Sequence, residues 1–359
     1  MSAPTVRINA IGTAVPNHDI HHAFIGWAEQ QIPESRARAV FKRMAERSGI
    51  GHRYSVLPTQ PGGGSPVTEG GFYAVNPLPP TSQRMAHYGH YAPALALDAI
   101  ESLRQQVALD NITHLVVASC TGFVAPGIDQ IIAAKMGLSP SVERLLVGFM
   151  GCYAAVSALR SARHIVRSDP QARVLVITVE LSTLHLQPDT DIEPLLAMLQ
   201  FGDGAAAALV TGNGAGLSIE APFATTLKDS SDLIRWAIGD YGFAMHLSGQ
   251  VPLRIADALR DPDLVHAIAG DDPSAIEAWA VHAGGRSILD AVEQGLGLSA
   301  DALTHSRAVL TDFGNMSSAT LMFVLARQFA EVPKSGVALA FGPGLAAEGF
   351  QFRAVPADA

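Results

Sequence analysis

The amino-acid sequence predicts an α/β protein built around a buried sheet. Short apolar runs that alternate with helical patterns indicate this class, because strands covered on both faces read as continuous apolar segments. The chain has 359 residues, of which 48% are hydrophobic, and this suffices for one large core or for two fused halves. A glycine-rich stretch at residues 212–216 predicts a boundary between an N-terminal half (1–214) and a C-terminal half (215–359).

The predicted elements follow in chain order. A strand at 4–14 precedes a basic helical pattern at 33–50, and a loop rich in glycine and proline covers 57–80. From residue 92 the rhythm is regular. We expect helices at 92–107, 128–136, 152–167, 285–295 and 316–330, and strands at 113–119, 144–150, 172–179, 205–211, 277–282, 307–311 and 336–341.

Charge and cysteine content argue against several classes of protein. The formal net charge of −9 gives no overall attraction to nucleic acid or to an anionic membrane. The two cysteines form no disulfide framework and lack zinc-site spacing, so we expect a reducing, cytoplasmic setting and no metal. Arg7, Asn9 and Pro16 would interrupt the apolar core of a signal peptide, so we expect none. The sequence has no run of 18 apolar residues, so we expect no membrane span.

Cys152 stands at a predicted strand-to-helix turn. It follows the apolar segment VGFM and Gly151, and it precedes the small-residue run AAVSALRSA. A thiol at the positive end of a helix has a lowered pKa and is a better nucleophile. A buried cysteine that serves only as a small apolar residue is the commoner case, and it stays open at this point.

His282 and Asn315 mark two further junctions. His282 ends a predicted strand and is followed by two glycines within three residues, and Asn315 lies in DFGNMSSAT before a predicted helix. Neither residue alone is strong evidence for a catalytic role, because the chain has 13 histidines and an asparagine before a helix also suits an N-cap. With Cys152 they form a pattern of one nucleophile and two donors to an oxyanion.

These segments resemble the type III polyketide synthases, the chalcone and stilbene synthase-like family of the thiolase superfamily, in its bacterial form. The resemblance covers nearly the whole chain. It rests on GC at 151–152, QFGDGAA at 200–206, WAVHAGGRSILDAVEQGLGL at 279–298, GNMSSA at 314–319 and FGPGL at 341–345. It implies a thiolase-like fold of two similar halves in αβαβα layers, a homodimer, and CoA thioesters as substrates without any cofactor.

The resemblance also implies a reaction. An acyl-CoA starter would load onto Cys152, which His282 would help to hold as thiolate. Malonyl-CoA would lose CO2, and His282 and Asn315 would bind the resulting enolate. The enolate carbon would then attack the Cys152 thioester, and cyclisation would release the product, for example an alkylpyrone or alkylresorcinol.

The binding residues are also implied by the resemblance. Phe201 and Met245 match the two gatekeeper positions between the CoA tunnel and the growth cavity. Arg43 and Arg47 match basic positions for the CoA phosphates, although Val40 falls where chalcone synthase has a lysine. Further positions assigned to substrate or CoA are Ser287, Ser317, Gly342, Pro343 and Gly344.

Four positions depart from chalcone synthase near the starter. Cys120, Ser182 and His185 fall on the cavity wall, and Cys120 is not expected to be a second nucleophile. Ala125 falls where that enzyme has a methionine that reaches across the dimer. Together with Met245, the small Ala125 predicts a roomy cavity that suits a fatty acyl starter.

Three alternatives remain at the level of sequence. A ketoacyl synthase III-like enzyme would take its substrate from an acyl carrier protein, and would prefer malonyl-carrier protein to malonyl-CoA. A cysteine hydrolase of papain type shares the chain order Cys, His, Asn, and would release free acid without taking up malonyl units. A non-catalytic scaffold would not need the three residues intact.

Overall fold

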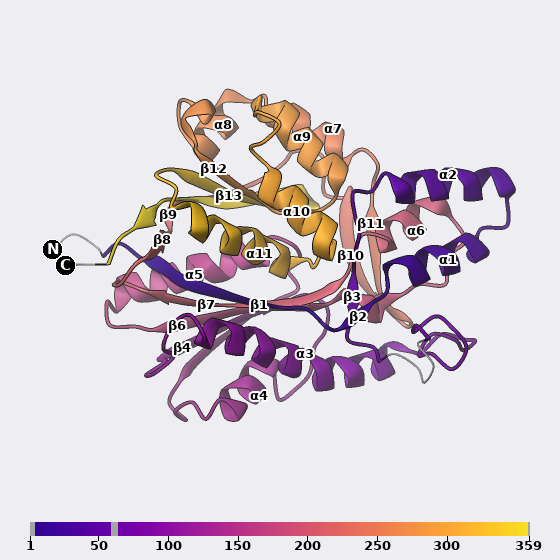
Figure 1. Cartoon of the computed structure of the whole chain (residues 1–359), viewed down its shortest axis with the longest axis horizontal. Helices are drawn as coiled ribbons and strands as arrows, with labels where there is room; N and C mark the ends of the chain where they lie inside the picture. Colours follow the sequence, from indigo (N-terminus) through magenta and orange to yellow (C-terminus); the bar gives the residue numbers. More distant parts are fainter. Residues whose placement is uncertain (1–3, 59–63, 358–359) are drawn as a thin grey trace.

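The computed structural model describes residues 4–58 and 64–357, which fold around two main β-sheets (Figure 1). The larger sheet has seven strands in the order β15-β8-β1-β7-β6-β4-β5. Strands β4, β5 and β6 run parallel to one another, and β7 is antiparallel to both β6 and β1. The strands of this larger sheet are β1 (Arg7–Ala14), β4 (His114–Ser119), β5 (Glu143–Gly148), β6 (Val174–Leu181), β7 (Asp203–Thr211), β8 (Gly216–Ser218) and β15 (Ala354–Val355).

The smaller sheet has four strands in the order β12-β13-β14-β9, with β12 and β13 parallel. Beside the two sheets stand the hairpin of β10 and β11 and a short pair formed by β2 and β3. These strands are β9 (Glu220–Thr226), β12 (Ala278–Val281), β13 (Gly336–Gly342), β14 (Ala346–Phe352), β10 (Ile234–Gly239), β11 (Gly242–Leu247), β2 (His18–Asp19) and β3 (Tyr54–Ser55).

Helices cover the sheets in layers (Figure 1). α5 (Ala154–Ser168) and α11 (Ser318–Gln328) lie between the two sheets and share one apolar core with both. α3 (Thr81–Arg104) and α4 (Ile128–Lys135) cover the outer face of the larger sheet. A third apolar core lies between the smaller sheet and four helices. These helices are α7 (Val251–Ala258), α8 (Pro262–Ala269), α9 (Arg286–Leu296) and α10 (Thr304–Phe313).

Small side chains allow the helices to pack closely against the larger sheet. Strand β7 carries a run of alanines whose alternate members face opposite cores, Ala206 and Ala208 toward the middle layer and Ala205 and Ala207 toward α3. Because a strand presents successive side chains to opposite faces, both faces of β7 are buried by helices. The resulting order of layers is helix, sheet, helix, sheet, helix.

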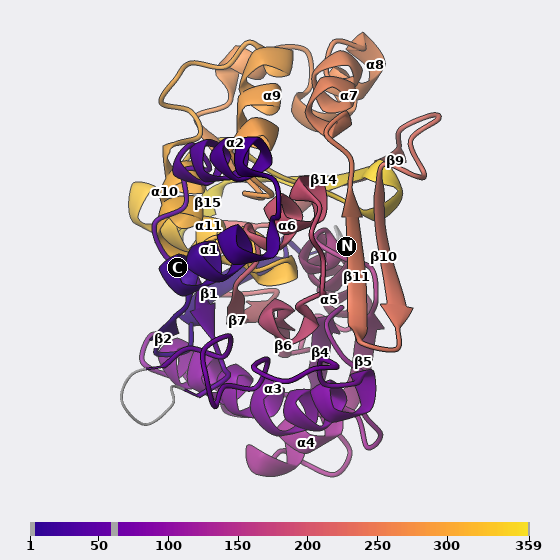
Figure 2. The same ribbon diagram turned by 90° about the vertical axis from the view of Figure 1, so that its right-hand side faces the viewer.

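One end of the molecule gathers elements from distant parts of the sequence (Figure 2). α1 (His21–Gln31), α2 (Ser35–Glu46) and α6 (Ile192–Met198) lie there together with the β10–β11 hairpin. The hairpin packs against α6, and α2 packs against both α1 and α6. The chain termini lie at the opposite end (Figure 1).

One predicted element is wrong. Residues 307–311, predicted as a strand, belong to helix α10. Among its buried residues, Val309 and Leu310 lie three and four positions after Ser306, which is helical spacing. The short apolar run AVL at 308–310 was therefore misleading. Helix α3 also begins at Thr81, eleven residues before the predicted start at 92, and passes through Pro93.

Two sequence-based expectations concern the connections. The predicted boundary near 214 falls in the turn between β7 and β8, and both β8 and β15 pair within the larger sheet. The segment from 64 to 80 forms turns and bends as predicted for the loop at 57–80, of which 59–63 lie outside the described residues. Within the described ranges, no helix is long and apolar enough to cross a membrane.

Candidate active site

Cys152 lies in the turn between β5 and α5, two residues before the helix begins. The preceding Gly151 has φ +80°, and a Cβ atom there would lie 2.3 Å from Cδ of Pro343. A side chain at position 151 is therefore excluded both by conformation and by the close approach of Pro343. Gly342, at the end of β13, likewise lies close to Tyr153 and to the backbone nitrogen of Cys152.

His282 directly follows β12, and its backbone N–H donates to the carbonyl of Leu339 at 2.8 Å. The side chain is buried, and neither ring nitrogen has a hydrogen-bond partner among the described residues. A buried polar group normally has a partner, so these nitrogens are available to a ligand.

Asn315 is held by backbone and side-chain contacts. Its backbone forms a bridge beside Phe201, donating to Gln200 O at 2.8 Å and accepting from Gly202 N at 3.0 Å. Its side-chain Oδ1 accepts from the Ser317 backbone N–H at 2.8 Å, and Nδ2 donates to Gly284 O at 3.1 Å. These two bonds fix the orientation of the amide and leave a second Nδ2–H free to donate.

A small cavity of about 40 Å³ brings the three predicted residues together. Cys152, His282 and Asn315 line it, and so do the predicted gatekeepers Phe201 and Met245. They come from three separate junctions in the fold. A nucleophile and two hydrogen-bond donors thus face one space, which is the arrangement that acyl transfer through an oxyanion requires.

The pKa of Cys152 differs from the sequence-based expectation. Burial raises the pKa of the thiol to about 12, and the Ser317 hydroxyl, 3.7 Å from Sγ, opposes that rise. Burial also lowers the pKa of His282 to about 3. In the ligand-free site burial therefore favours the neutral form of both groups.

Cys120 lies across a small space from Cys152 and is surrounded by hydrogen-bonding groups. Its sulfur is 3.2 Å from Ser317 Oγ and 3.5 Å from Glu180 Oε2, and its backbone N–H donates to the same carboxylate oxygen. Burial raises the pKa of Cys120 well above its ordinary value, and the adjacent Glu180 carboxylate raises it further. Both effects keep Cys120 a protonated thiol.

Two further cavities adjoin the one at Cys152. A space of about 10 Å³ lies between Cys120 and Cys152 and is also lined by Ser317 and Pro343. A larger cavity of about 340 Å³ lies beyond it and is bordered by the loop residues Ser65, Pro66 and Val67. The residues that line both are Ser182, Phe201, Trp236 and Met245. Because Phe201 and Met245 line all three spaces, they stand where the spaces meet.

Trp236 is a wall residue that sequence reasoning missed. Its indole N–H donates to Cys120 O at 2.8 Å, and it lies directly opposite Met245 in the β10–β11 hairpin. Part of the wall between the 10 Å³ space and the 340 Å³ cavity is thus an aromatic ring fixed by a hydrogen bond. The hairpin register would have revealed this, but no hairpin was predicted.

His185 lines the large cavity, and its polar atoms are held by backbone groups. Its Nε2–H donates to Thr121 O at 2.8 Å, and its Nδ1 accepts from the Phe243 backbone N–H at 3.0 Å. The ring stacks on Phe243 with centroids 4.2 Å apart, and burial lowers its pKa to about 3. Both nitrogens are satisfied by the backbone, so the imidazole acts as a fixed, neutral spacer.

Other predicted residues lie outside these cavities. Arg43, Arg47 and Ser287 are exposed on α2, at its C-terminal cap, and on α9. Ala125 is exposed on the loop after β4, where a cis peptide bond joins it to Pro126. Gly344 lies in the turn after Pro343, with its carbonyl 3.4 Å from Ser230 Oγ.

The fold and the site together define a condensing enzyme of the thiolase-like class. The N-terminal domain of the chalcone and stilbene synthases matches residues 2–214, and the C-terminal domain of the same family matches residues 218–356. The chain therefore belongs to the chalcone and stilbene synthase family. It is a type III polyketide synthase, an acyltransferase that uses malonyl-CoA.

Individual relatives support the same family assignment. The chain is 36% identical over 287 residues to the alpha-pyrone synthesis polyketide synthase-like Pks18 of Mycobacterium tuberculosis, covering 75% of this chain and 72% of that protein. It is 34% identical to the type III polyketide synthase C of Arabidopsis thaliana over 68% of each chain. The crystal structure of PKS-I from Ectocarpus siliculosus superposes with a TM-score of 0.87, at 30% identity and over 99% of this chain and 100% of that one. The thiolase-like fold is thus confirmed, and neither a hydrolase nor a carrier-protein-dependent synthase is favoured.

Proposed function

We propose that Cys152 carries the acyl chain and that His282 and Asn315 bind the thioester oxygen of malonyl-CoA. The observation that supports this best is the shared cavity, in which the buried His282 ring has no partner among the described residues. Loss of CO2 from the malonyl group leaves an enolate. A neutral imidazole N–H and the free Asn315 N–H are donors suited to that developing charge.

The two donors are prepared in different ways. The Asn315 amide is oriented by its bonds to Ser317 and Gly284, so it needs no reorganisation when the substrate enters. His282 is kept neutral by burial, and a neutral ring can both donate to the enolate and accept the proton of Cys152. The enolate carbon then attacks the acyl carbonyl on Cys152, and the cysteine sulfur leaves as thiolate.

Decarboxylation of malonyl-CoA without a starter tests these roles separately. We expect Asn315→Ala and His282→Ala to slow the release of CO2 by about a hundredfold, the usual loss for one oxyanion donor. We expect Cys152→Ala to retain decarboxylation but to form no condensed product. Equal loss of both steps in all three variants, with folding intact, would contradict the division of roles.

We propose an acyl-CoA starter whose product is a pyrone. The relative Pks18 is described as an alpha-pyrone synthesis polyketide synthase-like protein, and this supports that product class. Next to Cys152, however, the spaces hold only about 40 and 10 Å³, so the roomy cavity expected from Met245 and Ala125 is not found there. A long acyl chain would have to enter the 340 Å³ cavity beyond Trp236.

We also propose a homodimer in which β5 pairs with β5 of a second copy. β5 is an edge strand, and its Leu145 and Leu146 are 43% and 40% exposed. Phe123, on the loop that leads to Ala125, is 42% exposed as well. Proteins rarely leave an apolar strand edge open, and a second copy would cover it and bring Ala125 toward the partner's cavity.

The remaining proposals concern substrate delivery and location. Arg43, Arg47 and Ser287 would contact the CoA moiety at the surface, and CoA thioesters would be the only small molecules that the reaction needs. The free thiols of Cys120 and Cys152 suit a reducing compartment, which supports the cytoplasm.

A further inference from the structure

Arg286 opens helix α9 at the rim of the Cys152 cavity. Gly284 and Ile288, on either side of it in sequence, both line that cavity together with His282. Arg286 itself is exposed, with 55% of its side chain open to solvent. The start of α9 therefore borders the space where the thioester would react, while the Arg286 side chain lies at the surface.

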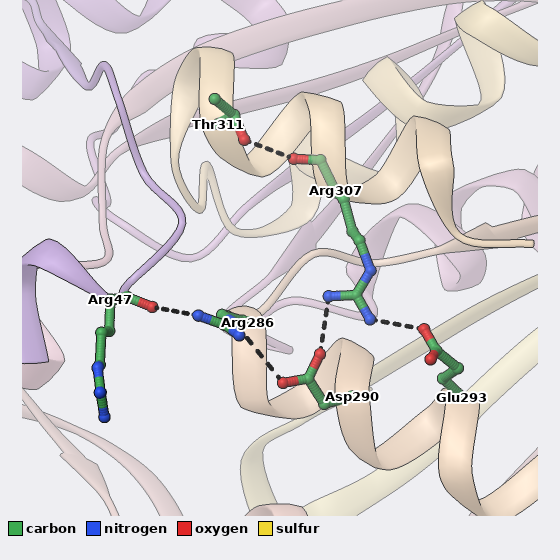
Figure 3. A network of polar contacts seen from close by, with 6 residues as sticks. All are labelled: Arg47, Arg286, Asp290, Glu293, Arg307 and Thr311. Carbon is green, nitrogen blue, oxygen red and sulfur yellow. Dashed lines mark hydrogen bonds and ion pairs between the residues drawn. The ribbon is translucent and has the colours of Figure 1, made fainter. Parts of the chain in front are cut away.

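Contacts join Arg286 to the end of α2 (Figure 3). Its Nη1 donates to the Arg47 carbonyl at 3.2 Å. Its aliphatic stem lies against Gly49, since a Cβ at Gly49 would be 3.9 Å from both Cβ and Cδ of Arg286. The helix that carries Arg43 and the helix that carries Arg286 thus meet here, one from each half of the chain.

The local electrostatics favour an anion. The first turn of α9 has no acidic residue, so Arg286 adds its charge to the positive end of the helix dipole. A cation there is unfavourable for the helix alone. Arg43 and Arg47 are also exposed, at the end of α2 that Arg286 contacts, in a chain whose net charge is −9.

Arg286 is only loosely engaged by its acidic neighbour. Its Nε lies 3.7 Å from Asp290 Oδ2, and exposed pairs of this kind contribute little. Asp290 has a shorter partner in Arg307, at 2.8 Å, which in turn contacts Glu293 at 2.7 Å (Figure 3). Arg286 is therefore able to turn to a ligand without leaving Asp290 unpaired.

We propose that Arg286 is a third cation of the CoA site and contacts a phosphate of the bound thioester. This rests on the proposed use of CoA at Arg43 and Arg47. The planar guanidinium offers two parallel donors, which match phosphate oxygens. It also supplies a positive charge beside α2, the helix in which Val40 replaces the lysine of chalcone synthase.

The test compares two malonyl thioesters that differ in their phosphates. Malonyl-CoA has them, and the malonyl thioester of N-acetylcysteamine has none. Decarboxylation of each is measured for wild type, Arg286→Gln and Arg286→Lys. We expect Arg286→Gln to lower the ratio of kcat/KM for malonyl-CoA to that for the short thioester about five- to tenfold, the loss of one exposed charge-assisted contact. Arg286→Lys should recover part of it.

Arg104→Gln is the matched control, because Arg104 is 51% exposed and pairs with Glu101 in the same helix. It should leave the ratio unchanged. An unchanged ratio in Arg286→Gln, whether activity is kept or falls equally on both thioesters, would overturn the proposal; the equal fall would make Arg286 a purely structural link to α2. If wild type processes neither thioester, the proposed function itself fails.

Discussion

Cys152 and His282 occupy a pocket that favours the neutral form of each. Burial raises the pKa of the thiol and lowers the pKa of the imidazole. A lone thiolate is costly in such a site, whereas a thiolate beside an imidazolium is compensated. The nucleophile that we propose therefore depends on its histidine more than on the nearby helix.

This dependence predicts a pH effect. In His282→Gln no imidazole can accept the Cys152 proton and become the cation that compensates the thiolate, so deprotonation needs a higher pH. We expect the midpoint of iodoacetamide alkylation at Cys152 to rise by about 1–3 pH units relative to wild type. Peptide mapping separates Cys152 from Cys120, and coincident midpoints would count against the pairing.

Trp236 gives a prediction about substrate size. Trp236→Ala removes the ring that stands between the 10 Å³ space beside Cys120 and Cys152 and the cavity of 340 Å³. We expect the variant to shift its preference toward longer acyl-CoA starters, as measured by mass analysis of products from a starter panel. Trp236→Phe, which keeps a ring, should resemble wild type. An identical starter profile in all three enzymes would contradict the claim that the Trp236 ring restricts access to the large cavity.

The sequence indicated which polar residues meet in the candidate site better than it indicated which residues shape the surrounding cavities. Cys152, His282 and Asn315 stand in distinctive glycine-rich contexts, and the structure places them in one cavity. Trp236 and the backbone bonds of His185 depend on pairing between distant strands, which a single sequence does not reveal. The roles of the three residues stay predictions until they are measured.

At the scale of elements, the edge strand β5 carries the proposed dimer. Lysines at Leu145 and Leu146 would place two charges in the middle of a paired edge. We expect Leu145→Lys/Leu146→Lys to sediment as a monomer, whereas wild type sediments as a dimer. Leu253→Lys, at another exposed leucine on α7, is the control. A wild type that is already monomeric would exclude the dimer.

Strands and helices with long apolar runs were predictable, and β4, β6, β7 and β13 lie within two residues of their predicted bounds. The error at α10 came from the three-residue apolar run 308–310, which fits a strand or a helix equally well. The β10–β11 hairpin was missed because its turn, Asp240–Tyr241, lies between strands with mixed polarity, and it is this hairpin that carries Trp236 and Met245.

At the scale of the molecule, His185 couples folding to pH. Its pKa is about 3 in the folded protein and about 6.5 when unfolded. The unfolded chain thus binds one more proton between these values, so stability is complete above pH 6.5 and is lost as pH falls. We expect the unfolding free energy of wild type to fall about 1.4 kcal/mol per pH unit more steeply than that of His185→Gln over this window. Parallel slopes in denaturant titrations would contradict this.

The fold class was predictable as a whole because its signal is repeated along the chain. Alternating apolar strands and helices indicated an α/β protein, and the glycine-bearing junctions indicated the family. The ligand spaces were not predictable, since each depends on side chains from four or more elements.

The central claim is that Cys152 carries the growing chain, and mass analysis of the acylated peptides tests it most directly. The enzyme is incubated with an acyl-CoA starter, with and without malonyl-CoA, and then digested for peptide mapping. We predict the acyl mass on the peptide that contains Cys152, lost in Cys152→Ala and kept in Cys120→Ala. An acyl group on Cys120, or none on either cysteine while product still forms, would contradict the account.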